Sequence, residues 1–540
     1  MVSVQEFAER RPYNAATDFV DANIERGRGD KTAFTDGRRK LSYGELQVQS
    51  QRFAHGLHAL GLKPESRIAL LLLDTVDYPV AFWGSIRAGV VCIPLNTLLT
   101  PEQYLYMLDD SRAEAIFVSA PLLKCIEPIA ARLPNLKRVI VVGDDGAQPK
   151  QLAGREIITF EEVLDRGKTD PWTAQTISDE VAFWLYSSGS TGQPKGAKHV
   201  HSSLIATAKL YGQDVLGIRA DDVVYSAAKI FFAYGLGNAM SFPMSVGATT
   251  ILLPDRPAPD AIFALMKREQ PTIFYGVPTL FAAMLAHKEI GKGAGSTRLR
   301  WCVSAGEALP ANLGLRWKEI VGADILDGIG STEMLHIFVS NRPGDVRYGT
   351  SGKPVPGYDA KIIDEHGQEV GAREIGELVI RGPSAADGYW NQRAKSRRTF
   401  AGEWTYTGDK YIRDDEGYYQ YCGRTDDMFK VSGNWVSPFE VEAALASHDA
   451  VLEAAVIGEE DDDKLVKPKA YVVLKPGVSA DAQLLDSLRE HVKASAGLWK
   501  YPRWIEFRSE LPKTATGKIQ RFKLREESAA EKAKGPGKAA

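Results

Sequence analysis

The sequence predicts an α/β fold in which layered helices and strands are followed by a β-rich region and a small C-terminal domain. The length of 540 residues exceeds the size at which one hydrophobic core keeps growing, so at least two domains are expected. Short apolar runs recur between helical stretches from about residue 30 to residue 350, as in strands that helices cover on both faces. From there to about residue 425, short strands bounded by glycine predominate.

The expected strands are apolar runs that are too short for helices. They lie at residues 67–73, 115–118, 139–142 and 249–253, and the β-rich region adds 360–363 and 376–381. Runs of this length between turn signals are typical of buried strands. The layers are therefore expected to be α/β.

The C-terminal region has the pattern of a separate domain of about 100 residues, which is enough to fold alone. The expected elements are a helix at 438–447, strands at 453–457 and 470–474, and a helix at 480–494. We place the domains at residues 1–425 and 426–525. Residues 526–540 have almost no large apolar side chain, so a disordered tail is expected there.

Composition excludes several classes of protein. With 66 basic and 69 acidic residues the net charge is -3, so no overall field would attract nucleic acid or an acidic membrane. The four cysteines form no C-x-x-C pair, which argues against a disulfide framework and a thiolate zinc site. The N-terminus lacks a signal-peptide core, and the apolar runs are shorter than a membrane span. We expect a cytoplasmic protein with neither nucleic acid nor membrane as partner.

Residues 186–196, YSSGSTGQPKG, have the composition of a phosphate-binding loop. Glycine lets main-chain N–H groups approach anionic oxygens, hydroxyls donate hydrogen bonds, and lysine supplies positive charge. The polar side chains involved would be those of Ser187, Ser188, Ser190, Thr191 and Lys195. The loop therefore predicts ATP binding. The alternative is a solvated Gly/Ser turn between two strands.

The spacing in this loop argues against P-loop kinases and motors, which need G-x-x-x-x-G-K-[ST] followed by a helix. Pro194 stands where the last glycine should be, and Gly196 replaces the hydroxyl residue that would bind magnesium. Because proline lacks an N–H, it also removes a donor that such a loop uses.

Five further motifs follow the loop in order. They are SAGEA at 304–308, DGIGSTE at 327–333, YTGD at 406–409, GRTDD at 423–427 and PKTATGK at 512–518. Each alone is compatible with an ordinary loop. Together with the phosphate loop, over about residues 30–525, they resemble the adenylate-forming superfamily of acyl-CoA synthetases, peptide-synthetase adenylation domains and beetle luciferase. The resemblance implies a large N-terminal domain of two layered α/β subdomains plus a β-rich subdomain, and a small mobile α+β C-terminal domain.

The resemblance also implies a nucleotide site. The implied phosphate-binding residues are Ser187, Ser188, Thr191, Lys195 and, for the α-phosphate, Thr332. Glu333 would coordinate Mg²⁺, a cation that prefers oxygen ligands. The implied adenine walls are Gly306, Glu307, Asp327, Gly328 and Ile329. Asp409 and Arg424 resemble the ribose-binding pair, although an exposed turn carboxylate is the alternative for Asp409.

Lys518 is the implied catalytic lysine, with Glu333 and Thr332 as its catalytic partners. Attack of a carboxylate on the α-phosphate gathers negative charge, so a lysine bridging the reactants stabilises the transition state more than the ground state. The alternative is a solvated lysine in a basic tail. Asp426 matches the hinge about which the small domain turns between two half-reactions. Lys518 also resembles lysines that an acetyltransferase and a deacetylase modify in related ligases.

The acyl acceptor is expected to be free coenzyme A, because only 22 residues follow Lys518 and a carrier domain would not fit there. A stand-alone adenylation enzyme that loads a separate carrier protein is the alternative. A luciferase-like oxidation is disfavoured, since no residue distinguishes it.

The acid is expected to be aromatic. Residues 229–238 and 331–338 carry aromatic and small side chains, which suit a flat slot. By periodicity alone, Phe231, Phe232 and Tyr234 are more often core residues than ligand wall. Four sequence segments closely resemble those of benzoate-CoA ligases and their hydroxybenzoate-specific relatives. They are GIGSTEMLHIF, SAGEALP, RYGTSGKPVPGY and KVSGNWVSPFEVE. The residues that would line the ring site or orient the carboxylate are Ala233, Tyr234, Ala305, Gly330, His336, Ile337 and Lys430. Many acyl-CoA synthetases carry an arginine shortly after the Ser432–Gly433 pair, and here Trp435 stands in that region. This departure argues against nucleotide contacts of the acetyl or propionyl type and fits the aryl branch.

These expectations combine into a Mg²⁺- and ATP-dependent aryl-CoA synthetase. It would convert benzoate or a hydroxybenzoate to the CoA thioester through an acyl-AMP intermediate, releasing AMP and pyrophosphate. Aminobenzoate, other aryl acids and short cyclic acids are alternatives, as is a non-catalytic nucleotide-binding regulator. The oligomeric state is open, a homodimer included.

Overall fold

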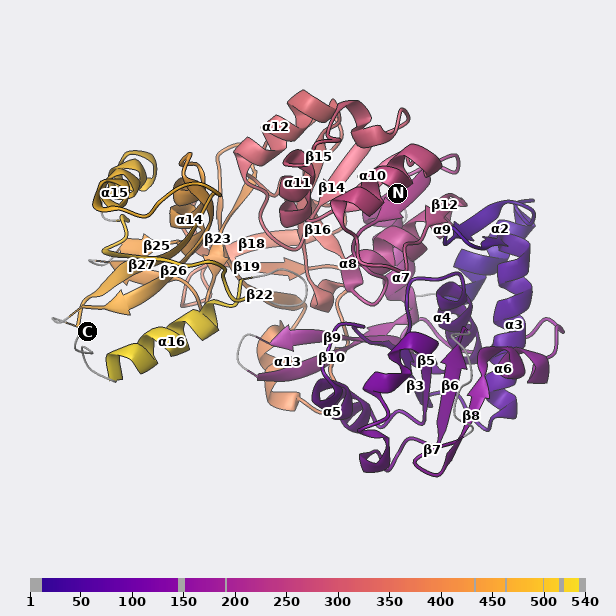
Figure 1. The fold of residues 1–540 in the computed structure, drawn as a ribbon. Helices are drawn as coiled ribbons and strands as arrows, with labels where there is room; N and C mark the ends of the chain where they lie inside the picture. The colour runs from indigo at the N-terminus through magenta and orange to yellow at the C-terminus, as the bar shows by residue number, and fades with distance from the viewer. Residues whose placement is uncertain are drawn as a thin grey trace. The chain divides into compact units, whose positions relative to one another are not determined.

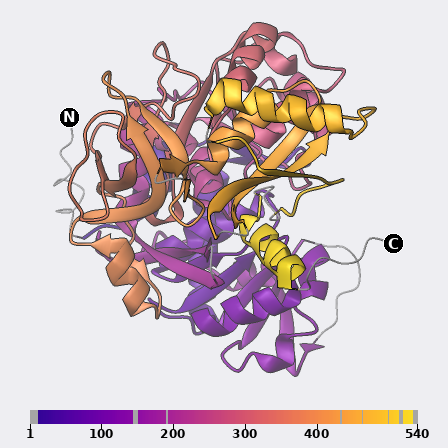
Figure 2. The ribbon, with the colours of Figure 1, turned by 90° about the vertical axis from the view of Figure 1, so that its left-hand side faces the viewer.

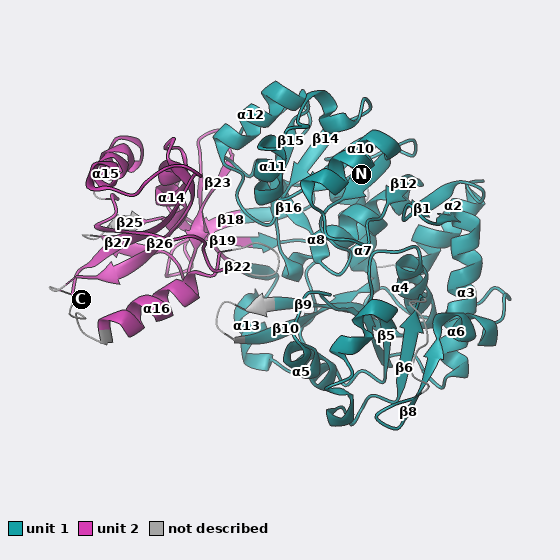
Figure 3. Cartoon of the chain, in the orientation of Figure 1, with its two compact units in different colours: residues 1–360, 380–406 teal, residues 361–379, 407–540 magenta. Residues whose placement is uncertain are grey.

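The computed structural model describes residues 12–143, 151–189, 192–431, 434–461, 464–498, 500–513 and 519–533. The chain forms two compact units (Figure 3). Unit 1 comprises Met1–Ala360 and Ile380–Tyr406, and unit 2 comprises Lys361–Val379 and Thr407–Ala540.

Unit 1 contains two nine-stranded sheets in its described part. The first runs in the order β17 (Lys353–Pro354), β16 (Ile337–Ser340), β15 (Ile325–Gly330), β14 (Trp301–Ser304), β13 (Ile273–Gly276), β11 (Val223–Ser226), β12 (Thr249–Ile251), β1 (Thr32–Thr35) and β2 (Lys40–Ser42). The second runs β20 (Gly388–Tyr389), β10 (Gly192–Val200), β9 (Val181–Gly189), β4 (Val91–Pro94), β3 (Arg67–Leu71), β5 (Ala115–Ser119), β6 (Arg138–Val142), β8 (Arg155–Thr159) and β7 (Gln151–Leu152). The central strands of both sheets are parallel.

Helices cover these sheets as the apolar runs predict (Figure 1). The first sheet packs one face on α10 (Pro259–Glu269), α11 (Pro278–Leu285) and α12 (Ala311–Val321). The second packs one face on α5 (Pro101–Ser111), while α3 (Tyr43–Ala59) and α6 (Phe160–Arg166) place Phe53 and Phe160 against Phe117 of β5. Strands buried on both faces read as continuous apolar runs, which explains the sequence pattern. The α/β fold class is confirmed.

The helix starts are set by local residues. In α3 the Ser42 side chain accepts from the Glu45 N–H and the Glu45 carboxylate accepts from the Ser42 N–H, and α6 repeats this capping box with Thr159 and Glu162. The other unit 1 helices are α2 (Ala22–Glu25), α4 (Asp77–Ala88), α7 (His201–Thr207), α8 (Ala233–Leu236), α9 (Phe242–Val246) and α13 (Arg393–Thr399). None of the described helices has both the length and the apolar character that crossing a bilayer requires.

A third sheet contains the predicted strands of the β-rich region. Its order is β18 (Asp359–Ile363), β19 (Gly376–Arg381), β22 (Trp404–Arg413) and β21 (Phe400–Ala401), with β23 (Tyr419–Arg424) paired to β22. The boundary between the two units falls within strands of this sheet.

Unit 2 also contains the predicted C-terminal elements. They are β24 (Phe429–Val431), β25 (Asn434–Val436), α14 (Pro438–Ala446), β26 (Val451–Glu460), β27 (Val466–Leu474), α15 (Ala482–Ala496), β28 (Trp504–Phe507) and α16 (Arg521–Ala533). Alternate residues of β26 and β27 face two clusters, one shared with α14 and α15 and the other with Leu524 of α16. Figures 1 and 2 accordingly show α14 and α15 on one face of this sheet and α16 on the other.

The prediction of disorder from residue 526 is wrong for residues 526–533, which belong to α16. Leu524, just before this stretch, is fully buried, and Ser528 is only 4% exposed and accepts from Lys469 Nζ at 2.9 Å. Only one narrow face of the helix packs on the sheet, so the helix needs few apolar residues. Its composition is therefore as polar as that of a disordered segment. Residues 534–540 lie outside the described residues.

The predicted boundary at residue 425 stays a prediction, and the compact units divide the chain differently. Residues 409–413 pair with β23, and Tyr421 of β23 makes an edge contact with Phe439 of α14 at 5.5 Å between ring centroids. Packing therefore joins this stretch to the C-terminal elements.

Candidate active site

The predicted phosphate loop is the end of an antiparallel hairpin. Strands β9 and β10 pair Ser187 with Lys195 and Gly189 with Gly192. Of the residues named for phosphate binding in this loop, Ser190, Thr191 and the side chain of Ser188 lie outside the described residues. The described residues of the segment thus belong to two paired strands, and both its phosphate-binding role and the alternative of a solvated turn stay predictions.

Beside the hairpin, the structure brings Glu333 together with Ser187 and Lys195. Glu333 lies in a short 3-10 helix, η7 (Thr332–Met334), just after β15. Its Oε1 is 3.4 Å from Ser187 Oγ and 3.9 Å from Lys195 Nζ. Tyr389 of β20, which sequence reasoning missed, donates from its hydroxyl to the same Oε1 at 2.7 Å. No motif marks Tyr389, because its place depends on the pairing of β20 with β10.

The main chain at Thr332 is anchored to the hairpin. Nε2 of His199, on β10, lies 2.8 Å from the Thr332 carbonyl oxygen. His199 is fully buried and stacks on Phe183 of β9, and burial lowers its pKa to about 4. A neutral His199 therefore donates to this carbonyl, and the role of the Thr332 hydroxyl toward the α-phosphate stays a prediction.

Helix α5 supports the hairpin from the side. Tyr186 donates to Asp110 Oδ2 at 2.7 Å, and Trp390 Nε1 donates to the Asp110 carbonyl at 2.9 Å. Burial raises the pKa of Asp110. Tyr106 donates to the Pro194 carbonyl at 3.2 Å. These contacts fix the strand that carries Lys195.

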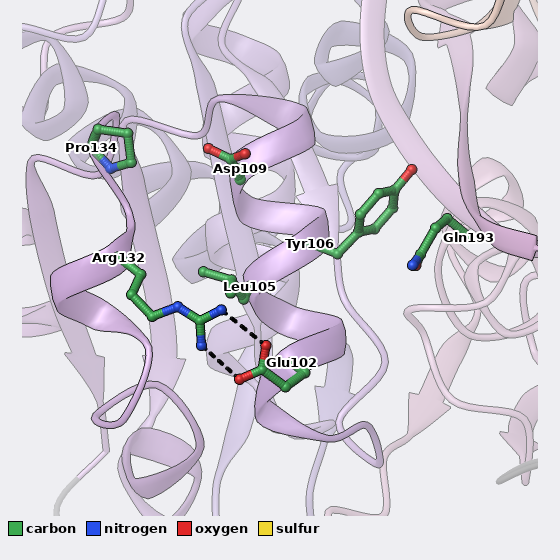
Figure 4. Close-up of a pocket in the computed structure, with 7 residues that line it drawn as sticks. All are labelled: Glu102, Leu105, Tyr106, Asp109, Arg132, Pro134 and Gln193. Carbon is green, nitrogen blue, oxygen red and sulfur yellow. Dashed lines mark hydrogen bonds and ion pairs between the residues drawn. The ribbon is translucent and has the colours of Figure 1, made fainter.

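An open pocket of about 560 Å³ lies along this helix, lined also by Arg132 and Pro134 and by Gln193 of the hairpin (Figure 4). Arg132 and Glu102 form two hydrogen bonds of 2.7 and 3.2 Å across it, and Tyr106 points toward Gln193. Since Arg132 is already paired and the walls are charged, this pocket does not suit an aryl ring.

The predicted adenine segments lie side by side. SAGEA follows β14 and DGI lies on β15, and these parallel strands pair Ser304 with Asp327. Ligands of open α/β sheets bind at the carboxyl ends of such strands. Asp327 is only 4% exposed, and burial raises the pKa of its carboxyl well above the usual range. The juxtaposition agrees with an adenine slot, whereas the individual roles of Gly306, Glu307, Asp327, Gly328 and Ile329 stay predictions.

The predicted ring site is a buried cluster around His336. Nε2 of His336 lies 3.1 Å from Asn238 Oδ1 and 3.2 Å from the Tyr234 carbonyl oxygen, so Nε2 carries the proton. The imidazole stacks on Tyr211 at 5.4 Å and meets the edge of Phe242 at 4.4 Å. Asn238 was not among the predicted site residues, although it ends the aromatic segment.

The hydroxyl of Tyr234 is used by the protein itself. It lies 3.0 Å from the Val303 carbonyl oxygen and 3.2 Å from that of Gly276. Position 237 requires a glycine, because a Cβ there would lie 2.3 Å from His336 Cδ2. The other predicted ring-site residues of unit 1 are buried or half-buried, namely Ala233, Ala305, Gly330 and Ile337.

The remaining predicted residues belong to unit 2. Asp409 and Arg424 face each other on β22 and β23, and Arg424 Nη1 donates to Asp409 Oδ1 at 2.9 Å. Asp426 lies in the turn after β23 and Lys430 on β24, both exposed. Lys518 lies outside the described residues. The ribose, hinge, carboxylate-orienting and catalytic roles of these residues stay predictions.

Comparison with known protein families shows to which family the chain belongs. The AMP-binding enzyme model matches residues 20–390, and the AMP-binding enzyme C-terminal domain model matches residues 440–518. The chain belongs to the AMP-binding enzyme family. The resemblance drawn from the motifs is thereby confirmed.

Several members of this family are similar to the chain over nearly its whole length. A 4-hydroxybenzoate–CoA/benzoate–CoA ligase of Rhodopseudomonas palustris is 54% identical, covering 96% of this chain and 94% of its own. A benzoate–CoA ligase of Thauera aromatica is 55% identical, covering 95% and 96%. A crystal structure of the anthranilate CoA ligase AuaEII in complex with anthranoyl-AMP matches with a TM-score of 0.91 and 42% identity, covering 97% of this chain and 99% of that one.

The buried state of His336 predicts a pH effect on stability. Burial lowers its pKa to about 3, whereas an unfolded histidine titrates near 6.5. The unfolded state therefore binds more protons between these values, and this contribution to stability is lost as the pH falls. Between pH 7 and pH 5 the wild type should lose about 2 kcal/mol more unfolding free energy than His336→Gln, measured by urea denaturation. The exposed His58→Gln variant should follow the wild type, and identical pH dependence for His336→Gln would contradict the prediction.

Proposed function

We propose that the protein is an AMP-forming aryl-CoA ligase. The oxygen of an aryl carboxylate attacks the α-phosphorus of ATP and pyrophosphate leaves; the CoA thiolate then attacks the acyl carbon and AMP leaves. The observation that carries the proposal is the segment 327–337, which runs from the strand beside SAGEA, through Glu333 next to Lys195, to His336 in the aromatic cluster. One short stretch thus supplies a nucleotide wall, a carboxylate for a cation and a wall for a ring.

The residues around Glu333 fit a magnesium-bound triphosphate. Mg²⁺ is commonly held by one or two carboxylates with phosphate oxygens and waters as further ligands. Glu333 supplies one carboxylate, while Lys195 and Ser187 lie beside it to face phosphate oxygens. When bound, the cation would neutralise charge on the leaving pyrophosphate. The described residues contain no cluster of three acidic, histidine or cysteine ligands, so the phosphates would complete the coordination.

The ring cluster supports an unsubstituted or lightly substituted aryl acid. Aromatic rings and small residues surround His336, which burial keeps neutral, and the Tyr234 hydroxyl is already satisfied by main-chain oxygens. The similar ligases act on benzoate, 4-hydroxybenzoate or anthranilate. We propose benzoate or a hydroxybenzoate as the acid, with aminobenzoate as the second candidate.

An acid-dependent ATP–pyrophosphate exchange assay tests this function. Benzoate, the three hydroxybenzoates and the aminobenzoates should be compared, followed by thioester formation with CoA. We expect exchange with benzoate or a hydroxybenzoate to exceed that with acetate by at least about 100-fold, because a small acid leaves the apolar slot unfilled. Exchange with none of the aryl acids would refute the proposal. Thioester formation only on a carrier protein, and not on CoA, would favour the stand-alone adenylation alternative.

Finer aspects also stay proposals. Control by a lysine acetyltransferase and deacetylase acting on Lys518 follows from the charge that adenylation needs. A homodimer and a cytoplasmic location are consistent with the composition.

A further inference from the structure

We propose that Tyr389 is a positioning residue for the adenylation half-reaction. Its hydroxyl would hold the Glu333 carboxylate and the Lys195 ammonium so that both face the magnesium–triphosphate of ATP. This inference rests on the proposed function and deepens it, because it assigns a role to a residue that no motif marks.

The hydroxyl of Tyr389 bridges the two charged groups. It donates to Glu333 Oε1 at 2.7 Å and accepts from Lys195 Nζ at 3.1 Å, whereas Lys195 Nζ and Glu333 Oε1 are 3.9 Å apart. A phenol can donate and accept at once, so it satisfies both groups without changing their charge. Hydrogen bonds to charged partners are the stronger kind.

The ring of Tyr389 is fixed by its surroundings. The residue is 5% exposed, packs with Ala197 and Ala386, and lies 5.4 Å from the Phe400 ring. Lys195 Nζ lies 4.4 Å from the ring centroid, within the range of a cation–π contact. The ring and the hydroxyl of this fixed side chain therefore both contact the lysine ammonium.

The main chain around Tyr389, like its side chain, links the strand that carries Lys195 to the segment that carries Glu333. Strand β20 pairs Tyr389 with Ala197 of β10, the strand that carries Lys195. Three residues earlier, the Ala386 N–H donates to the Glu333 carbonyl at 2.8 Å. This short strand thus ties the hairpin to the segment that carries the carboxylate, and Tyr389 is the side chain at that junction.

The hydroxyl of Tyr389 keeps Lys195 and Glu333 from closing into a direct ion pair. A lysine and a glutamate this close attract each other, and the attraction is strong where, as here, both side chains are mostly shielded, at 20% and 16% exposure. A closed ion pair would compete with Mg²⁺ for the carboxylate and with phosphate for the ammonium. Because both groups hydrogen-bond to the phenol, they stay 3.9 Å apart and not at hydrogen-bond distance, and each keeps a direction in which to meet its ligand.

Tyr389→Phe tests the proposal, since it removes only the hydroxyl and keeps the ring. We expect the dissociation constant of ATP at a fixed Mg²⁺ concentration, measured by calorimetry without acid, to rise about 10- to 100-fold, and the Mg²⁺ concentration for half-maximal exchange to rise in parallel. Conversion of supplied benzoyl-AMP and CoA to the thioester should stay within about twofold of wild type, because that half-reaction uses no triphosphate.

The matched control is Tyr43→Phe, which also removes a buried hydroxyl, bonded to the Ala248 carbonyl at 2.7 Å at the start of α3. It should leave ATP affinity and Mg²⁺ dependence unchanged. Unchanged ATP affinity and Mg²⁺ dependence in Tyr389→Phe, or an equal loss in both half-reactions, would overturn the proposal. A wild type inactive with every aryl acid would refute the proposed function instead, while ATP binding would still test Tyr389.

Discussion

Replacing Lys518 with alanine should slow acyl-AMP formation by about 10²- to 10³-fold, the range found when one preorganised donor to a charged transition state is removed. Conversion of supplied acyl-AMP to the thioester should stay nearly unchanged, because the carboxylate no longer has to approach a phosphate. Exchange of labelled pyrophosphate measures the first step, and thioester formation from benzoyl-AMP measures the second. Stoichiometric acetylation of Lys518 should have the same effect, since it removes the same charge.

A control for this prediction lies at the start of the same motif. Lys513 pairs with Glu453 at 2.6 Å and is not among the predicted catalytic residues. Lys513→Ala removes an equal charge from the segment and should keep adenylation within about threefold of wild type, since surface ion pairs are weak. Equal losses in the two variants would identify Lys518 as one solvated lysine of a basic tail.

Replacing Arg521 with methionine should destabilise the C-terminal elements of unit 2 by about 3–5 kcal/mol, as is typical when one partner of a buried ion pair is removed. Arg521 of α16 makes two hydrogen bonds to Glu442 of α14, at 2.9 and 2.6 Å. Glu442 is only 8% exposed and otherwise accepts from the Val456 N–H at 2.7 Å, so its buried carboxylate would be left without a cation. Hydrogen exchange of the β26 and β27 amides reports the free energy of opening for this unit.

Two further variants separate charge from packing in this prediction. Arg521→Met combined with Glu442→Leu should recover part of the loss, because an apolar pair leaves no unpaired charge; the recovery is incomplete because the Val456 N–H loses its acceptor. Arg489→Met removes a partly exposed pair with Asp486 at 3.5 Å and a hydrogen bond to the Arg503 carbonyl at 3.1 Å, and it should cost about 1 kcal/mol or less. A small effect of Arg521→Met, similar to that of Arg489→Met, would contradict the prediction.

Much of the fold could be predicted because local patterns reflect burial directly. The run at 67–73 contains β3 (Arg67–Leu71), and the helix expected at 438–447 is α14 (Pro438–Ala446). The prediction of disorder was wrong for residues 526–533, because buried Leu524, just before the predicted tail, and buried Ser528 anchor α16. So little apolar surface leaves no signal in a composition that is otherwise polar.

For the candidate site, the sequence by itself determined which chemical groups are present. They are a loop with hydroxyls and a lysine, a carboxylate in GSTE, and a lysine in PKTATGK. Residue type and motif order are enough for this, because each step of adenylation needs particular charges and donors. Only the tertiary structure decided which of these groups meet. Tyr389 joins Lys195 to Glu333 because β20 pairs with a hairpin almost 200 residues earlier in the chain. Contacts over such separations depend on strand pairing and packing, which no local pattern encodes.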